Sequence, residues 1–177
     1  MRALFLDRDG VINVDHGHVG TRDRFDFMPG IFGVAQTAAS RGYGLFVITN
    51  QAGIARGLYS EDDFFQLMEW VQGEFAKRGA PIRKVYHCPH HPEYGSSGVY
   101  VACDCRKPAP GLLLAAAHEF NIDMQASILL GDKETDMIAG IAAGVGSLIL
   151  LGKAPVDHRW SCVSSLEEVE VMLGAIA

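Results

Sequence analysis

The sequence lacks any long apolar run. Its apolar stretches, such as Gly111 to Ala117, fall far short of the roughly 18 residues that a membrane-spanning helix needs. The apolar start from Ala3 to Leu6 stops at Asp7, before the length that a secretory signal requires. We therefore expect no membrane partner and a cytoplasmic, reducing location for this chain.

Positive charge is also scarce. Lys and Arg number 15 against 21 Asp and Glu, which gives a formal net charge of −6 and a pI near 5.6. A chain with this balance does not carry the basic surface that is typical of nucleic-acid binding, so we expect no nucleic-acid partner. If the chain binds phosphate groups, it needs local cations or a metal ion to do so.

The composition argues against disorder and fibrous structure. Hydrophobic residues make up 49% of the chain and charged residues 20%, close to the averages of soluble globular proteins. A chain of 177 residues can bury a large core without disulfides. We expect a single domain over residues 1–177, and a monomer.

Short apolar runs alternate with amphipathic stretches along the chain. The pattern predicts strands at 2–6, 45–48, 83–87, 127–130 and 147–151. It predicts helices at 29–41, 60–77, 110–120 and 134–143, and a last helix that Ser165 caps. Five apolar strands that alternate with helices indicate an α/β fold, namely a three-layer, Rossmann-like parallel sheet with helices on both faces.

Small polar or acidic residues follow three of the predicted strands. The first strand ends at Asp7, the second at Thr49 and Asn50, and the fourth at Asp132. In parallel sheets, ligands bind beyond the carboxyl ends of the strands, near the point where the strand order reverses. We therefore expect these side chains to meet at one edge of the sheet.

The carboxylates at this edge suit phosphoryl transfer. Asp7 could attack an electrophilic phosphorus, and Asp9 could protonate the leaving oxygen and later activate water. Asp132 could complete a site for Mg²⁺, which binds carboxylates together with waters and phosphate oxygens. The alternative interpretation of Asp7 and Asp9 is a solvated acidic turn at the end of a strand.

Four short motifs carry these residues. They are Asp7-Arg8-Asp9-Gly10, Thr49-Asn50, Lys107-Pro108 and Gly131-Asp132-Lys133-Glu134-Thr135-Asp136. Together they resemble the haloacid dehalogenase (HAD) superfamily of phosphotransferases over nearly the whole chain. The resemblance implies that Asp7 is the nucleophile, that Asp9 is the general acid/base, and that Thr49 and Lys107 hold the transferring phosphoryl group. It implies that Mg²⁺ is bound by Asp7, by the main-chain carbonyl of Asp9 and by Asp132.

An aspartate at position 9 is typical of phosphatases in that superfamily, whereas relatives with a long-lived aspartyl-phosphate tend to carry Thr there. The alternative from another functional class is a non-enzymatic regulatory domain that is phosphorylated on Asp7. The presence of Asp9 argues against this alternative. We interpret Asp136 as an exposed residue of the helix at 134–143, and the alternative is a supporting role behind the metal ligands.

Three of the four cysteines, Cys88, Cys103 and Cys105, lie close together in the sequence, with histidines near the first of them. A structural zinc site with four protein ligands could be formed by Cys88, His90, Cys103 and Cys105. His91 is the rival for the imidazole position, and packed thiols beside solvent-facing histidines are the alternative to a metal. Zinc would pin the loop at 88–108 and so could position Arg106 and Lys107, which follow the last cysteine.

The cysteine segment narrows the resemblance. Cys88-Pro89-His90-His91-Pro92 and Cys103-Asp104-Cys105-Arg106-Lys107-Pro108 are similar to a zinc-containing branch of the superfamily, which includes heptose bisphosphate phosphatases and histidinol-phosphate phosphatases. The segments 49–57 and 13–18 and the long zinc loop look like the heptose enzymes. The resemblance then implies substrate contacts from Asp15, His16, Gly17, His18, Asn50, Gln51, Ala52, Arg106 and Lys133.

This branch implies a reaction. We expect Mg²⁺-dependent hydrolysis of the C7 phosphate of a heptose 1,7-bisphosphate, in the biosynthesis of nucleotide-activated heptose for lipopolysaccharide core or another glycan. A histidinol-phosphate phosphatase or a broader sugar-phosphate phosphatase is the alternative. Neither the segment after Gly10 nor the zinc loop leaves room for a cap domain, so we expect a capless enzyme whose site is walled by loops at 13–20, 51–58 and 88–108.

Overall fold

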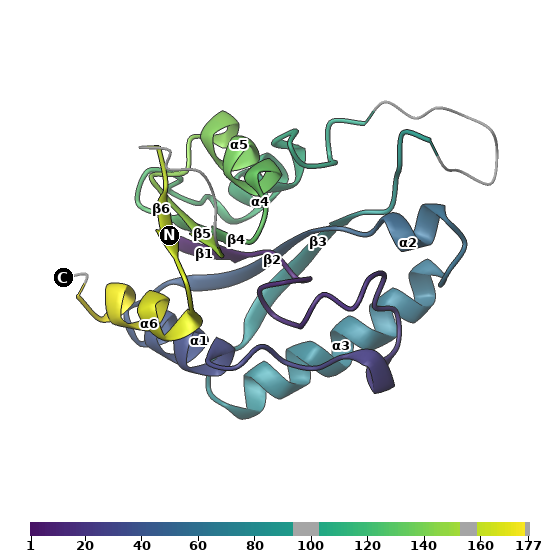
Figure 1. Cartoon of the computed structure of the whole chain (residues 1–177). Coiled ribbons are helices and arrows are strands. Elements are labelled where there is room, and N and C mark those ends of the chain that lie inside the picture. The colour runs from purple at the N-terminus through teal and green to yellow at the C-terminus, as the bar shows by residue number, and fades with distance from the viewer. Residues whose placement is uncertain (94–102, 153–158, 176–177) are drawn as a thin grey trace.

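Six parallel strands form the centre of the computed structural model, in the order β3-β2-β1-β4-β5-β6 (Figure 1). The structure describes residues 1–93, 103–152 and 159–175, and all six strands lie within these ranges. The strands are β1 (Ala3–Leu6), β2 (Gly44–Asn50), β3 (Ile82–Cys88), β4 (Ile128–Gly131), β5 (Ser147–Leu151) and β6 (Ser161–Val163). The five predicted strands are confirmed, and the prediction of only five was wrong. The sixth strand, β6, has three residues, two of them exposed, and so has no apolar run to reveal it.

The helices cover both faces of the sheet (Figure 1). One layer consists of α1 (Ile31–Ser40), α3 (Glu61–Lys77) and α6 (Leu166–Ala175), and the other of α4 (Gly111–Phe120) and α5 (Glu134–Ala143). The first layer shares a buried core with Leu4 and Val47, and the second with Phe5 and Phe46. Adjacent strand residues point to opposite faces, and both faces are buried, which explains the continuous apolar strands. The predicted three-layer α/β fold is confirmed.

Two short helices lie in loops near the sheet. They are η1 (Arg22–Arg24), a 3-10 helix, and α2 (Ala52–Ala55). The sequence pattern predicts only an irregular loop from Thr49 to Tyr59, so α2 is a correction, as is the extension of β2 to Asn50. A helix of four residues is too short to show a periodic apolar face.

The predicted starts of α3 and α6 agree with side-chain capping contacts in the structure. Asp63 N donates to Ser60 Oγ at 3.0 Å, and Ser60 N donates to Asp63 Oδ2 at 2.8 Å, which forms a capping box at α3. Glu168 N donates to Ser165 Oγ at 3.4 Å at the start of α6. Within the described ranges, no helix combines the length and the apolar character that crossing a membrane would require.

The strand order reverses between β1 and β4. The chain runs outward from β1 to β2 and β3, then returns to β4 and continues to β5 and β6 on the other side. Asp7 N donates to the carbonyl of Leu130 at 3.0 Å, so the end of β1 is fixed beside the end of β4. The crevice at this switch point is where ligands bind in sheets of this kind.

Candidate active site

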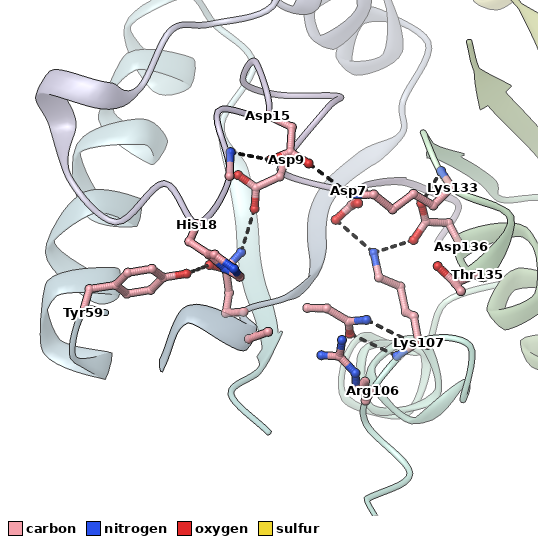
Figure 2. Close-up of a pocket in the computed structure, with 14 residues that line it drawn as sticks. Asp7, Asp9, Asp15, His18, Tyr59, Arg106, Lys107, Lys133, Thr135 and Asp136 are labelled. Carbon is pink, nitrogen blue, oxygen red and sulfur yellow. Dashed lines mark hydrogen bonds and ion pairs between the residues drawn. The ribbon is translucent and has the colours of Figure 1, made fainter. Parts of the chain in front are cut away.

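An ion-paired lysine occupies the switch point (Figure 2). Lys107 Nζ lies 2.9 Å from Asp7 Oδ1 and 2.7 Å from Asp136 Oδ1, and it donates to the carbonyl of Ile48 at 2.8 Å. All three charged side chains are buried. Burial alone would lower the pKa of Lys107, but the carboxylates of Asp7 and Asp136 outweigh it and raise the pKa, so the ammonium group stays charged.

Asp136 is buried, and its interpretation as an exposed helix residue was wrong. Its side chain is 1% exposed. Besides pairing with Lys107, it accepts a hydrogen bond from Lys133 N at Oδ2, at 3.1 Å. The side chain lies in the first turn of α5 and turns back toward the helix N-terminus, which faces the switch point. The acid three residues after Lys133 is the signal of such a cap in the sequence.

Three carboxylates form an acidic group at the same place. Asp7, Asp132 and Asp136 each offer an oxygen within 4.8 Å of the other two. Burial, followed by the charge of Asp7, raises the pKa of Asp132 to about 7, and its buried Oδ1 accepts no hydrogen bond from the described residues. The opposite backbone is Gly10, at φ 93°, where a Cβ would lie 2.2 Å from Asp132 Oδ2. This crowded acidic group can hold a divalent cation, which would offset the repulsion among the carboxylates.

Asp9 is held by donors on both of its oxygens. Arg8 Nη2 donates to Oδ1 at 2.7 Å and Asn13 Nδ2 donates to the same atom at 3.0 Å. Gln51 Nε2 donates to Oδ2 at 3.1 Å and also to Thr49 Oγ1 at 2.8 Å. Two of the predicted catalytic residues, Asp9 and Thr49, therefore share one amide group as their hydrogen-bond donor.

Asn50 holds the backbone of Lys107. Its Oδ1 accepts from Lys107 N at 3.0 Å, and its Nδ2 donates to the carbonyl of Lys107 at 3.0 Å. Both polar atoms of the amide are thus engaged by the loop that carries Lys107. A direct contact between Asn50 and a substrate stays a prediction, and the structure gives this side chain a positioning role.

A pocket of about 440 Å³ opens over these groups (Figure 2). Its lining consists of Asp7, Asp9, Asp15, Gly17, His18, Asn50, Gln51, Ala52, Tyr59, Arg106, Lys107, Lys133, Thr135 and Asp136. Most of the predicted catalytic and substrate-binding residues therefore lie around one cavity. Among the residues of the lining, Tyr59 and Thr135 were not predicted as site residues. A lone tyrosine in a loop carries no motif, and Thr135 was noted only as part of the motif at 131–136.

Three of the predicted catalytic, substrate-binding and magnesium residues do not line this pocket. Thr49 is 1% exposed and lies behind the Gln51 amide. Asp132 lines a neighbouring cavity together with Gly10. His16 Nε2 lies 2.8 Å from Asp26 Oδ2 at the surface, so its imidazole is engaged outside the pocket. The pocket lining therefore does not support His16 as a substrate contact, and that role stays a prediction.

Two further cations lie in the pocket wall. Lys133 Nζ lies 3.3 Å from Asp15 Oδ2 and 3.6 Å from Asp132 Oδ2. Burial opposes the charge of Lys133, but the nearby carboxylates outweigh burial and raise its pKa. Arg106 Nη1 donates to the carbonyl of His90 at 3.2 Å. The acidic chain thus concentrates three cationic side chains at one cavity, which suits an anionic ligand.

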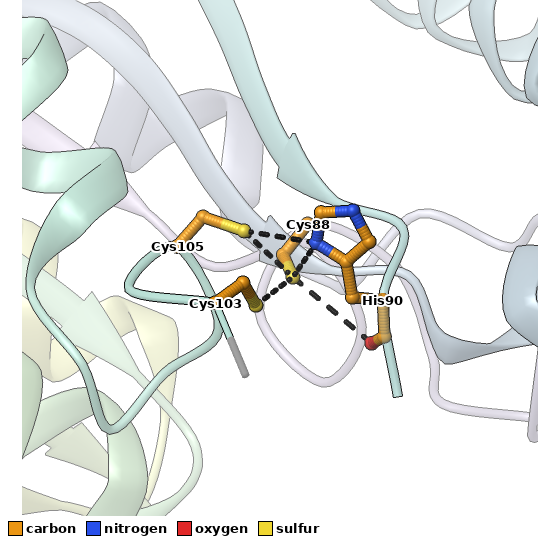
Figure 3. A group of neighbouring side chains, drawn as sticks. All are labelled: Cys88, His90, Cys103 and Cys105. Atoms are coloured by element: carbon orange, nitrogen blue, oxygen red, sulfur yellow. Dashed lines mark hydrogen bonds between the residues drawn. The ribbon is translucent and has the colours of Figure 1, made fainter. Parts of the chain in front are cut away.

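The predicted zinc ligands lie together in the structure (Figure 3). Cys88, His90, Cys103 and Cys105 each offer a ligand atom within 4.8 Å of the others. Cys88 Sγ lies 3.1 Å from Cys105 Sγ and 3.6 Å from Cys103 Sγ, and His90 Nδ1 lies 3.3 Å from Cys105 Sγ. A tetrahedral zinc with bonds of about 2.3 Å separates its sulfur ligands by roughly 3.8 Å, so the donor set is suitable for zinc.

His90, and not its rival His91, belongs to this cluster. His91 Nδ1 instead accepts a hydrogen bond from Glu93 N at 3.1 Å. The middle of the predicted zinc loop, residues 94–102, lies outside the described residues. The two ends of the loop therefore carry all four donors.

The fold and the site define a HAD-like hydrolase. The HAD-hydrolase-like family model matches residues 104–157. A HAD-like phosphatase structure from Mesorhizobium loti superimposes with a TM-score of 0.87 at 31% identity, covering 98% of this chain and 86% of that one. The structure of a D,D-heptose 1,7-bisphosphate phosphatase from B. bronchiseptica, complexed with magnesium and phosphate, gives a TM-score of 0.85 at 24% identity and covers 98% of each chain.

Curated relatives specify the family. The D-glycero-alpha-D-manno-heptose-1,7-bisphosphate 7-phosphatase of Burkholderia mallei is 56% identical over 85% of this chain and 79% of its own length. The D-glycero-beta-D-manno-heptose-1,7-bisphosphate 7-phosphatase of Vibrio cholerae is 49% identical over 93% of this chain and 89% of its own length. The chain belongs to the family of D-glycero-D-manno-heptose-1,7-bisphosphate 7-phosphatases. It is therefore a phosphoric monoester hydrolase.

Proposed function

We propose that the chain hydrolyses the C7 phosphate of D-glycero-D-manno-heptose 1,7-bisphosphate and releases heptose 1-phosphate. The pathway would be the synthesis of nucleotide-activated heptose for lipopolysaccharide core or another glycan. The names of the relatives support this substrate. The observation that carries the proposal is a pocket in which the buried Asp7 lies beside Lys107, while Arg106 and Lys133 supply further positive charge for a second phosphate.

Each catalytic side chain has a defined role in this proposal. Asp7 attacks the phosphorus and forms an aspartyl-phosphate, while Asp9 gives a proton to the departing C7 oxygen. Asp9 then takes a proton from the water that hydrolyses the intermediate. Lys107 and Thr49 stabilise the charge on the transferring phosphoryl group, in a geometry that Asn50 and Gln51 hold in place.

Mg²⁺ would be bound by Asp7, by Asp132 and by the main-chain carbonyl of Asp9. Both oxygens of Asp136 are engaged by Lys107 and Lys133, whereas Oδ1 of Asp132 has no donor among the described residues. This difference favours Asp132 as the ligand and gives Asp136 the role of a partner for Lys107. The ion would supply positive charge for the anionic substrate.

We further propose that Zn²⁺ is bound by the cluster of three cysteines and His90 and has a structural role. Replacing Cys105 with Ser is expected to lower the zinc content from about one ion per chain to near zero. A loss of about 2 kcal/mol of unfolding free energy would lower the melting temperature by roughly 5 °C. Metal analysis and thermal unfolding of the purified protein measure both effects.

The chain offers a matched control for this experiment. Cys162 is exposed in β6 and lies outside the cluster, so Cys162→Ser is expected to change neither quantity. Unchanged zinc content in Cys105→Ser would show that Cys105 is not a ligand.

Turnover of purified substrates tests the proposed reaction. We expect a higher kcat/KM for the heptose 1,7-bisphosphate than for histidinol phosphate, with inorganic phosphate released from C7. The α- and β-anomers are to be assayed separately, because relatives of this chain carry both designations. A higher kcat/KM for histidinol phosphate would instead establish the second candidate function.

Two further properties belong to the proposal. Thiolates that bind zinc must stay reduced, which supports the predicted cytoplasmic location. The described residues between β1 and α1 form a loop with only the short helix η1, which supports a single, capless domain. A monomer remains the expected state.

A further inference from the structure

Tyr59 lies at the pocket wall (Figure 2). Its ring fills a slot that two glycines, Gly20 and Gly53, leave open. A Cβ at Gly20 would lie 2.4 Å from the Cδ1 atom of the Tyr59 ring, and a Cβ at Gly53 would lie 2.3 Å from its Cε1 atom. Any side chain at either position would therefore collide with the ring. The close approach of the two glycine backbones fixes where the hydroxyl group of Tyr59 can lie.

The hydroxyl group of Tyr59 determines how the Gln51 amide is turned. It donates to Gln51 Oε1 at 2.6 Å. Burial raises the pKa of Tyr59 above its ordinary value, so the group remains a donor at neutral pH. Because the carbonyl oxygen of the Gln51 amide faces Tyr59, its Nε2 must face Asp9 and Thr49, to which it donates.

Gln51 in turn acts on one particular oxygen of Asp9. Oδ1 of Asp9 accepts hydrogen bonds from both Arg8 and Asn13, whereas Oδ2 accepts, among the described residues, only from Gln51. Oδ2 is therefore the oxygen with room to carry a transferable proton. The Gln51 contact fixes the direction of the remaining lone pair on Oδ2.

We propose that Tyr59 is a positioning residue: its hydroxyl group orients the Gln51 amide, which aligns Asp9 for proton transfer to the leaving oxygen. This inference rests on the proposed function, in which the bond from phosphorus to the C7 oxygen breaks as the bond to Asp7 forms. In that step the proton moves from Asp9 Oδ2 to the C7 oxygen. Tyr59 itself touches neither the proton nor the phosphorus and acts through Gln51.

Two substrates whose leaving groups differ in acidity distinguish a positioning role of Tyr59 from a purely structural one. A sugar alkoxide is a poor leaving group and needs the proton from Asp9, whereas p-nitrophenolate leaves without one. The ratio kcat/KM reports the steps up to departure of the leaving group. Tyr59→Phe keeps the ring in its slot but removes the hydroxyl group that orients Gln51. It is therefore expected to lower kcat/KM for the heptose bisphosphate about fivefold, equivalent to about 1 kcal/mol. It should change kcat/KM for p-nitrophenyl phosphate by less than about twofold.

Two other variants complete the experiment. Tyr86→Phe removes a hydroxyl group that donates to Glu119 at 2.7 Å on the edge strand β3, and it should leave both ratios unchanged. In a Gln51→Met background, Tyr59→Phe should have no additional effect, because the residue that transmits its influence is gone.

The outcomes distinguish the inference from the function on which it rests. Equal losses on both substrates, or no loss on either, would overturn the role of Tyr59. If the wild-type enzyme hydrolyses p-nitrophenyl phosphate and another alkyl phosphate but not the heptose bisphosphate, the proposed substrate is wrong. The comparison of leaving groups is then made with that alkyl phosphate. An enzyme without any phosphatase activity would overturn both proposals.

Discussion

Replacing Asp7 with Asn should reduce phosphate release from the heptose bisphosphate by at least about 10³-fold, because an amide cannot act as the nucleophile. The structure gives the reason for so large an effect. Asp7 is paired with Lys107 at the switch point, whereas the other carboxylates of the pocket lining are engaged elsewhere. Asp9 accepts hydrogen bonds on both oxygens, Asp15 pairs with Lys133, and Asp136 caps α5. Phosphate release in the presence of Mg²⁺ measures the effect.

The control for this variant is Asp62→Asn. Asp62 is an exposed acid in the first turn of α3, outside the pocket, and its loss should leave the rate unchanged. Equal rates for Asp7→Asn and the wild type would show that another group attacks the phosphorus. A burst of phosphoenzyme from the wild type, absent in Asp7→Asn, would be the positive sign of the covalent step.

Removing the buried lysine is the second change with a large expected effect. Lys107→Met would remove the ammonium group that pairs with both buried carboxylates, Asp7 and Asp136, and breaking a buried pair in this way costs about 3–5 kcal/mol. We expect the free energy of unfolding, measured by urea denaturation without added Mg²⁺, to fall by roughly 3 kcal/mol. Activity should be lost as well, since we propose that Lys107 stabilises the charge of the transferring phosphoryl group.

A double variant tests the cause of that destabilisation. In an Asp136→Asn background one of the two buried carboxylates is already neutral, so Lys107→Met should cost at least about 1 kcal/mol less than it does in the wild type. Equal costs in both backgrounds would mean that packing around the lysine stem, and not charge pairing, accounts for the loss.

The fold could be predicted because its main elements are long and periodic. The predicted bounds of α5 and β5 agree with the structure at both ends, and Ser60 marks the start of α3 through a side-chain contact that is local in sequence. The exposed strand β6 and the four-residue helix α2 could not be predicted from periodicity. Each is set by tertiary contacts rather than by its own pattern.

The residues of the candidate site likewise fall into those that the sequence predicts and those that depend on contacts distant in sequence. Asp7, Asp9 and Lys107 stand in motifs, so their meeting at one pocket follows from the sheet rule. The burial of Asp136 was mispredicted because its orientation depends on the cap at Lys133 and on a lysine that is distant in sequence. Tyr59 carries no motif, and its contact with Gln51 exists only because Gly20 and Gly53 leave space for the ring.

The clustering of the predicted zinc ligands has a consequence for how the length of this loop can vary. The sulfur atoms of Cys88 and Cys103 lie 3.6 Å apart, so the two described ends of the predicted zinc loop lie next to each other. A loop closed at its base can lengthen cheaply, since each doubling of its length costs only about 0.6 kcal/mol of closure entropy. We therefore expect insertions between His90 and Cys103 to leave Arg106 and Lys107 in place at the pocket. On this expectation, the segment can be lengthened, or can carry a grafted peptide, while the pocket is kept.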